Sequence, residues 1–333
     1  MQLPGFEYLE PRDLAEALDL LGEYGADCAV LAGGTDLIVR MKQRLKSPSR
    51  LMSLKHLKEL DYIRDVDGRL EIGAATPLAR IISSDIIQQQ YPGFHEAVAA
   101  VGARSIQHFR GTLGGNLCQD NRCRFYNQSA FFRSTRQACH KAGGTICYAR
   151  EGSDRCRSTC QSDGAPALMA LAADVTLRGV GSERTIALKD LYTAVGDAPL
   201  ALHPSELLTE ISIPLPGPGS GSAYRRLAFR SAIDYPIVSA AAFIRIEAGV
   251  IREARIVVGA IGSAPLFLVT AAKGLKDKPV DAAAALSAAA EMAGSSAAAF
   301  IVDNVNATME YRTAMIPVLV ARALKAALAN AGS

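Results

Sequence analysis

Residues 31–37 read Leu31-Ala-Gly-Gly-Thr-Asp-Leu37 and follow an apolar run, Cys28 to Leu31, that predicts a short buried strand. Consecutive glycines expose backbone amides and let the main chain approach a ligand closely, which favours a phosphate site. A second loop of similar chemistry is Gly111-Thr-Leu-Gly-Gly-Asn116. Neither loop matches G-x-G-x-x-G or G-x-x-x-x-G-K-S/T, so a Rossmann site and a P-loop are disfavoured. Together they predict a diphosphate-containing ligand held from two sides, although an ordinary turn would explain either loop alone.

Strand and helix patterns extend outward from these loops in both directions. The predicted helices are residues 13–24, 165–173, about 281–293 and 307–329, with a mainly helical stretch at 77–104. The predicted strands are residues 50–54, 70–74, 175–180, 211–214, 224–229, 239–247 and 253–261. The proline- and glycine-rich segment from Pro214 to Ser222 is the clearest linker. We therefore expect an α+β protein with two domains, 1–216 and 222–330, and an insert at about 118–160 in the first.

Composition bounds the class of protein. The chain has 333 residues, of which 49% are hydrophobic and 21% charged, as in a globular protein with a sizeable core. The net charge of +3 is too small to indicate nucleic-acid or membrane binding. Residues 1–10 lack the pattern of a signal peptide, and the apolar stretch 315–329 is interrupted by Arg322 and Lys325. We expect a cytoplasmic protein that binds neither nucleic acid nor membranes.

The cysteines are concentrated in the insert. Cys28 stands alone and is expected to be a core thiol, whereas Cys118, Cys123, Cys139, Cys147, Cys156 and Cys160 lie close together in the sequence. In a reducing compartment such a group indicates a metal site rather than disulfides. The insert also holds eight basic and three acidic residues, so it carries +5 and the remainder of the chain −2. Basic residues would offset the negative charge of an iron–sulfur cluster. A solvated basic loop and a zinc site remain alternatives.

Four motifs occur in an order that resembles a known family. They are Leu31-Ala-Gly-Gly-Thr-Asp-Leu37, Ile72-Gly-Ala-Ala-Thr76, Gly111-Thr-Leu-Gly-Gly-Asn116 and Ser162-Asp-Gly-Ala-Pro-Ala-Leu168. Together they resemble the FAD-binding medium subunit of the xanthine dehydrogenase and carbon monoxide dehydrogenase family. The resemblance implies a two-subdomain FAD-binding fold of the vanillyl-alcohol-oxidase type, followed by a smaller domain of antiparallel sheet and helices.

The resemblance also implies which residues bind the cofactor. The two glycine loops and the Thr76 motif would contribute Ala32, Gly33, Gly34, Thr35, Asp36, Thr76, Thr112, Gly114, Gly115 and Asn116. Asp163 matches an aspartate that binds the ribitol or ribose of FAD. Tyr224 is at the position where carbon monoxide dehydrogenase-like members place an aromatic ring over the flavin, although a half-buried strand tyrosine is the alternative. Residues 231–234 depart from the pattern of xanthine dehydrogenases, which weakens the case for NAD reduction.

The insert resembles that of one branch of the family, 4-hydroxybenzoyl-CoA reductase. In that branch the flavin subunit holds a [4Fe–4S] cluster, and the implied ligands here are Cys123, Cys139, Cys147 and Cys156. Cys118 and Cys160 would then be spare, with Cys160 the weaker exclusion and His140 an outside possibility as a ligand.

The implied function is electron transfer. Reduced ferredoxin would deliver electrons to the [4Fe–4S] cluster, which passes them to FAD and then to [2Fe–2S] and molybdopterin subunits, in a dimer of heterotrimers. The first alternative is an oxidative molybdenum hydroxylase of the same family, and the second is a zinc-dependent nucleic-acid-binding module. No catalytic acid, base or nucleophile is evident in the sequence.

Overall fold

The computed structural model describes residues 2–305 and 307–332 and contains three sheets. The first sheet is parallel, with the order β1-β3-β2. Its strands are β1 (Glu7–Leu9), β2 (Cys28–Leu31) and β3 (Arg50–Ser53), accompanied by α1 (Leu14–Tyr24) and α2 (Leu37–Lys42). The predicted helix at 13–24 is confirmed, because Asp13 caps it by accepting from the Glu16 amide at 2.9 Å. Leu14, Ala17 and Leu21 form its buried face.

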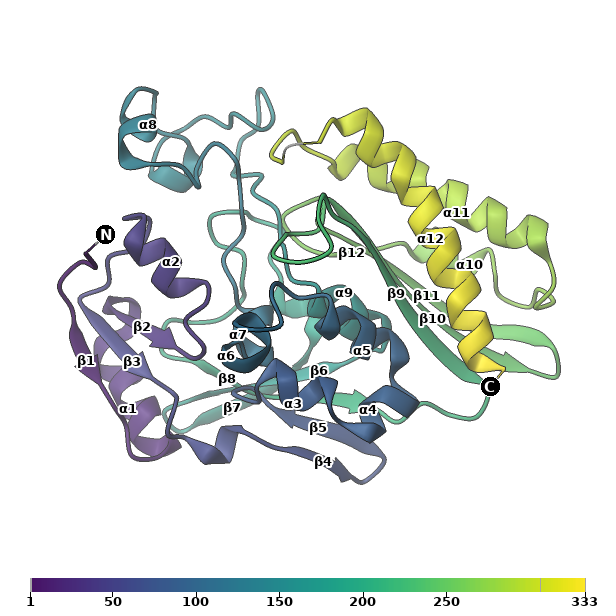
Figure 1. Cartoon of the computed structure of the whole chain (residues 1–333), viewed down its shortest axis with the longest axis horizontal. Helices are drawn as coiled ribbons and strands as arrows, with labels where there is room; N and C mark the ends of the chain where they lie inside the picture. Colours follow the sequence, from purple (N-terminus) through teal and green to yellow (C-terminus); the bar gives the residue numbers. More distant parts are fainter. Residues whose placement is uncertain (1, 306, 333) are drawn as a thin grey trace.

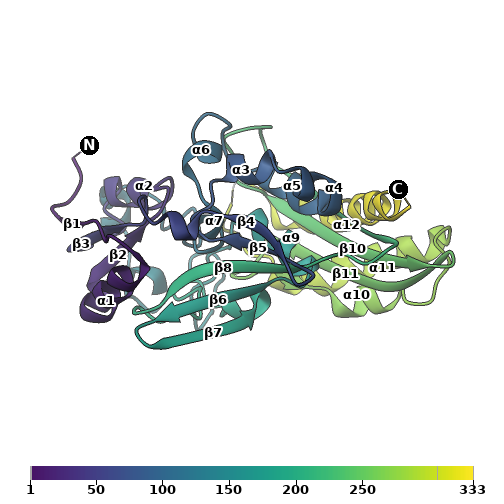
Figure 2. The ribbon, with the colours of Figure 1, turned by 90° about the horizontal axis from the view of Figure 1, so that it is seen from below.

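The second sheet is antiparallel and has five strands in the order β4-β5-β8-β6-β7. These strands are β4 (Ile63–Val66), β5 (Arg69–Gly73), β6 (Asp174–Gly179), β7 (Ser182–Ala187) and β8 (Leu207–Pro214). The helices that accompany it are α3 (Leu78–Ile82), α4 (Asp85–Gln90), α5 (Pro92–Ala99), α6 (Gln107–Arg110), α7 (Leu113–Leu117) and α9 (Gly164–Ala170). Figure 2 shows this sheet between the first sheet and the C-terminal part of the chain.

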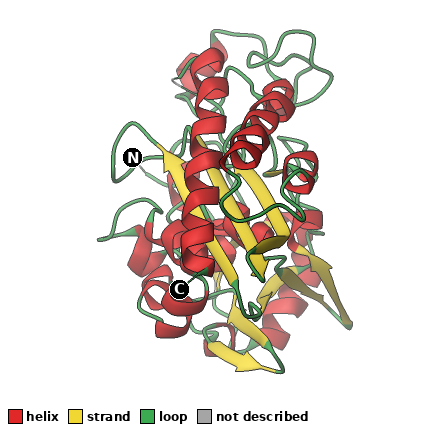
Figure 3. Ribbon diagram, turned by 90° about the vertical axis from the view of Figure 1, so that its right-hand side faces the viewer, coloured by secondary structure: helices red, strands yellow, loops and turns green. Residues whose placement is uncertain are grey.

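The C-terminal part is an antiparallel sheet, β12-β11-β10-β9, with helices on one face. Its elements are β9 (Ser220–Leu227), β10 (Val238–Glu247), β11 (Val250–Gly259), β12 (Leu266–Phe267), α10 (Val269–Lys273), α11 (Ala283–Ala297) and α12 (Met309–Ala331). Figure 3 shows α12 lying along this sheet. By length and composition alone α12 could cross a membrane. Its buried side chains instead belong to the core that it shares with β10 and β11.

The side chains of β10 pack into a hydrophobic core on each face of the C-terminal sheet. Successive side chains of a strand point to opposite faces. Ala241 and Phe243 belong to the core of the second sheet, whereas Ala242 and Ile244 belong to the core beneath α11 and α12. The mixed helix-and-sheet class predicted from the sequence is therefore confirmed, with an antiparallel C-terminal sheet covered by helices.

The insert projects from the sheets as loops with one short helix, α8 (Ala130–Ser134) (Figure 1). Asn121 anchors its base by donating its amide to the carbonyls of Ser158, at 3.1 Å, and Ser263, at 2.8 Å. Further along, Arg124 pairs with Asp303 at 2.6 Å, and the Tyr126 hydroxyl donates to the Leu45 carbonyl. The insert therefore contacts both the N-terminal region beside α2 and the C-terminal part. Short 3-10 turns complete the chain at 25–27, 58–60, 140–142, 188–191 and 298–300.

Candidate functional site

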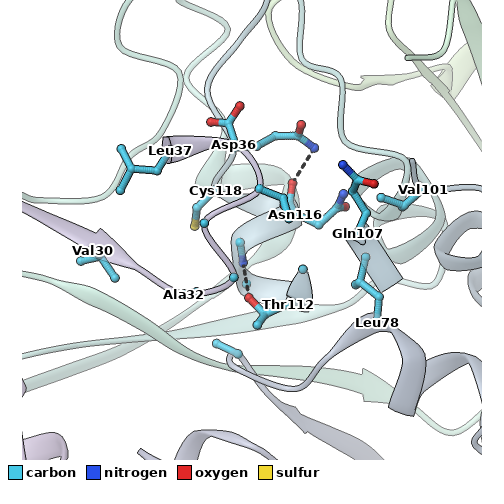
Figure 4. Close-up of a pocket in the computed structure, with 18 of the residues that line it drawn as sticks. Val30, Ala32, Asp36, Leu37, Leu78, Val101, Gln107, Thr112, Asn116 and Cys118 are labelled. Atoms are coloured by element: carbon cyan, nitrogen blue, oxygen red, sulfur yellow. Dashed lines mark hydrogen bonds between the residues drawn. The ribbon is translucent and has the colours of Figure 1, made fainter. Parts of the chain in front are cut away.

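A cavity of about 460 Å³ lies where the first and second sheets meet. Its volume is within the usual range for a cofactor or small-molecule site. Figure 4 shows Val30 and Leu37 on one side and Leu78, Val101 and Gln107 on the other, with Asn116 between them. Of the twelve residues predicted to bind the cofactor, ten line this cavity: Ala32, Gly33, Gly34, Thr35, Asp36, Thr112, Gly114, Gly115, Asn116 and Asp163.

The two glycine loops meet by close backbone contact. A Cβ atom added at Gly33 would lie 1.8 Å from the Arg110 carbonyl oxygen, so only glycine allows this approach. The second loop differs from the expectation, because residues 113–117 form the short helix α7 rather than an open loop. Thr112 begins that helix, and its hydroxyl accepts from the Gly115 amide at 3.1 Å. A Cβ atom at Gly115 would make a tight contact of 3.0 Å with Thr112 Oγ1, and its next neighbour would be Ala32 Cβ at 4.0 Å.

Asn116 connects the second glycine loop to the segment that carries Asp163. Its Oδ1 atom accepts from the Ser162 hydroxyl at 2.7 Å and from the Gly164 amide at 3.1 Å. These hydrogen bonds hold the start of the 162–168 motif, where α9 begins, against α7 at the edge of the cavity. Asn116 itself is buried, so its first role in the structure is to hold these two segments in register.

Among the described residues that line the cavity, Asp163 is the only buried carboxylate, and two side chains donate hydrogen bonds to it. The Tyr224 hydroxyl donates to Oδ1 at 2.6 Å, and the Arg226 guanidinium lies 3.1 Å from Oδ2. Burial raises the pKa of Asp163 above its usual value, while Arg226 and Tyr224 act in the opposite direction. Arg226 also donates to the carbonyls of Ala100 and Asp234, so it joins three segments around the cavity.

Thr76 and Tyr224 are the two predicted residues that do not line the cavity. The Thr76 hydroxyl donates to the carbonyl of Tyr62 at 3.0 Å and accepts from its amide at 3.1 Å, which fixes the chain after β5. Tyr224 is buried behind Asp163, in the core of the second sheet. Its hydroxyl contacts the lining residue Asp163, and the expected place of its ring over the flavin stays a prediction.

Several lining residues were not predicted from the sequence. They include Lys46, Gln107, Gln161, Glu206 and Tyr235. Gln161 is 2% exposed, and its Oε1 atom has no hydrogen-bond partner among the described residues, as expected of a group that contacts a ligand. None of them belongs to a recognisable motif, so only the fold could bring them to the cavity.

The four predicted metal ligands line a second, smaller pocket in the insert. Cys123, Cys139, Cys147 and Cys156 all face it, together with His140 and Lys141. Burial, with a smaller contribution from Cys156 and Cys147, raises the pKa of Cys123 to about 11. A tight turn between Cys139 and Cys147 requires glycine, because a Cβ at Gly144 would lie 1.8 Å from the Ala138 carbonyl oxygen.

The remaining cysteines lie outside this pocket. Cys160 is 3% exposed and packs in the core of the second sheet, and Cys118 lines the larger cavity. Cys28 is a core thiol beside α1, as expected. His140 does line the pocket, and its Nε2 atom lies 3.0 Å from the Ser153 carbonyl oxygen. Within residues 2–305 and 307–332, no group of three or more His, Cys, Asp or Glu side chains could hold a metal ion.

Comparisons with known proteins agree with this geometry. The family described as the FAD-binding domain in molybdopterin dehydrogenase matches residues 4–216, and the CO dehydrogenase flavoprotein C-terminal domain matches residues 222–327. The chain belongs to this family. It is thus the FAD-binding subunit of a multi-subunit molybdenum hydroxylase, as its four motifs predicted.

Individual relatives cover nearly the whole chain. The carbon monoxide dehydrogenase medium chain of Afipia carboxidovorans is 31% identical over 99% of each chain. The nicotinate dehydrogenase FAD-subunit of Eubacterium barkeri is 29% identical over 83% of this chain and 81% of its own. Among solved structures, carbon monoxide dehydrogenase from Hydrogenophaga pseudoflava has a TM-score of 0.80, at 27% identity and 99% coverage of both chains.

Proposed function

We propose that this FAD subunit also carries a [4Fe–4S] cluster and transfers electrons in a complex like 4-hydroxybenzoyl-CoA reductase. The observation that carries the proposal is the convergence of Cys123, Cys139, Cys147 and Cys156 on one pocket. Four thiols around one pocket suit a cubane, in which each thiolate binds a different iron atom.

The larger cavity fits FAD, and we propose that the two glycine loops hold its diphosphate. Gly33, Gly34 and Thr35 line the cavity, and their backbone amides are the donors proposed for the diphosphate. Gly114 and Gly115 line it as well, but their amides already donate to the Ala74 carbonyl and the Thr112 hydroxyl, so this loop would contribute close backbone approach. Lys46 also lines the cavity and supplies a positive charge. Asp163 would accept hydrogen bonds from the ribityl or ribose hydroxyls, held in place by Tyr224 and Arg226. Bound FAD supplies the exchange between one-electron and two-electron chemistry.

The surroundings of the cysteine pocket also support a negatively charged group. Burial raises the pKa of Cys156, and hydrogen bonds with Ser158 and the positive charge of Lys141, which also lines the pocket, act in the opposite direction. Arg124 and Arg157 flank Cys123 and Cys156 in the sequence. Such cations offset the charge of a thiolate-bound cluster and tune its potential.

The proposed partners follow from the family and from the insert. They are a molybdopterin-binding large subunit, a [2Fe–2S] small subunit and a reduced ferredoxin as electron donor, in a dimer of heterotrimers. The basic insert would attract an acidic electron carrier by long-range steering. Seven cysteines without a disulfide among the described residues favour a cytoplasmic location.

The second candidate is an oxidative molybdenum hydroxylase that sends electrons outward. The names of the relatives, which are dehydrogenases of carbon monoxide and nicotinate, favour it. In that case the insert would hold no low-potential cluster.

One set of measurements separates the two candidates. Iron, acid-labile sulfide, zinc and flavin would be determined on the chain purified without oxygen, with an EPR spectrum after dithionite reduction. About four irons and four sulfides per FAD support the reductase, in line with four cysteine ligands for one cubane. FAD without iron or sulfide would refute the cluster. If iron and sulfide are present, replacement of Cys147 by serine should lower the iron content, whereas replacement of Cys160 by serine should not.

A further inference from the structure

A network of five charged side chains lies between the FAD cavity and the cysteine pocket. Its members are Asp36, Arg40, Asp120, Arg122 and Lys141. Arg122 pairs with Asp36, Arg40 lies 3.0 Å from Asp120, and Lys141 lies 2.8 Å from the same carboxylate. No side chain in the network is more than 22% exposed, so salt screens these pairs much less than surface pairs.

The network contacts both sites directly. Asp36 and Arg40 line the FAD cavity, and Asp36 follows immediately after the first glycine loop. Lys141 lines the cysteine pocket, and Arg122 precedes Cys123 in the chain. A displacement of the glycine loop would therefore move a charge that is paired with the insert.

Backbone contacts hold the insert end of the network in place. Arg122 forms a β-bridge with Thr159, with N–O distances of 2.8 Å in both directions. This bridge brings together the two ends of the insert, one residue before Cys123 and three residues after Cys156. The Arg122 guanidinium also lies 5.1 Å from the centre of the Tyr235 ring, which lines the FAD cavity. The backbone of Arg122 thus joins the two ends of the insert, while its side chain contacts two residues that line the FAD cavity, Asp36 and Tyr235.

We propose that this network couples the two sites, so that FAD binding closes the cysteine pocket and fixes its four thiols. Bound FAD would hold the glycine loop, and Asp36 would then hold Arg122 and the base of the insert. By thermodynamic linkage, occupation of the cysteine pocket would increase FAD affinity by the same factor. The inference rests on the proposed function in that the pocket is taken as the second cofactor site.

The test is the rate at which single cysteines are alkylated in the full-length chain after iron removal, with and without saturating FAD. Iodoacetamide labelling would be mapped to each cysteine by peptide mass spectrometry. In the wild-type chain we expect FAD to slow labelling of Cys139 and Cys147 about five- to tenfold, within the usual range of coupling between sites. Cys118 is an internal control, because it lines the FAD cavity and FAD would cover it directly.

The double variant Arg122→Gln/Asp120→Asn removes both connections without changing the net charge. We expect it to lose the protection of Cys139 and Cys147 while FAD still protects Cys118. Its matched control, Arg178→Gln/Glu183→Gln, removes an exposed ion pair of the β6–β7 hairpin and should behave like the wild type. If the double variant does not fold, as judged by circular dichroism, the single Arg122→Gln variant should lose at least half of the protection.

Two results would overturn the inference. One is equal protection of Cys139 and Cys147 by FAD in the wild type and the double variant. The other is a wild-type chain in which FAD protects Cys118 but leaves Cys139 and Cys147 unprotected. The proposed cluster fails separately, on iron and sulfide analysis of the same preparation before the metal is removed. The labelling experiment measures the coupling between the FAD cavity and the cysteine pocket whether or not the preparation contained a cluster.

Discussion

Replacement of Gly33 by alanine should separate the two glycine loops and strongly weaken FAD binding. The added Cβ would lie 1.8 Å from the Arg110 carbonyl oxygen, 2.5 Å from its carbonyl carbon and 2.9 Å from the Gly111 Cα atom. All three are backbone atoms, so no side-chain rotation can relieve the contact. The loops must move until the first distance reaches at least 3.4 Å, where ordinary van der Waals contact begins.

A forced shift of this size in a packed region costs about 2–3 kcal/mol, which for a domain of this size lowers Tm by about 5–10 °C. FAD affinity should fall at least about 100-fold, because the diphosphate would lose backbone amides from one of the two loops, each hydrogen bond to a charged group contributing about 1.5–3 kcal/mol. Differential scanning calorimetry gives the first quantity, and titration of the apoprotein followed by flavin fluorescence gives the second.

Two other glycines provide matched controls. Gly115 lines the cavity, and a Cβ there would be close only to Thr112 Oγ1, a side-chain atom, at 3.0 Å, so Gly115→Ala should weaken FAD binding with little change in Tm. Gly217→Ala meets no atom within 4 Å and should leave both quantities unchanged. A Gly33→Ala variant with wild-type Tm and wild-type FAD affinity would refute the argument that this backbone contact sets the distance between the loops.

Three further predictions concern buried groups. Tyr224→Phe should weaken FAD binding about tenfold, because Asp163 loses a hydrogen-bond donor; unchanged affinity would instead favour a role for the ring itself. Arg312→Met should lower the free energy of unfolding by about 3 kcal/mol in urea titrations, since this fully buried guanidinium donates to three backbone carbonyls; a loss below about 1 kcal/mol would contradict this. Burial raises the pKa of Cys118 to about 12. In FAD-free protein the rate of Cys118 alkylation should therefore rise about tenfold per pH unit from pH 7 to 10, because the thiolate fraction grows in that proportion. A rate that levels off near pH 9 would contradict the raised pKa.

The sequence alone determined the features that depend on local chemistry. Asp13 and the spacing of Leu14, Ala17 and Leu21 were sufficient to predict α1, because capping and a 3.6-residue period act within one helix. The glycine loops were recognisable because close backbone approach permits few other residues. The clustering of cysteines was visible because six of them lie within residues 118–160.

Only the tertiary structure decided which side chains face the cavity. Tyr224 points into the core rather than the cavity, because the register of β9 against β10 sets the face of each residue. Gln161, Lys46 and Tyr235 reach the cavity from separate segments, and no local pattern marks them. The same holds for the pair of Asp36 and Arg122, which are far apart in the sequence. Such contacts depend on how the sheets and the insert pack together, and that arrangement is a property of the whole chain rather than of any one motif.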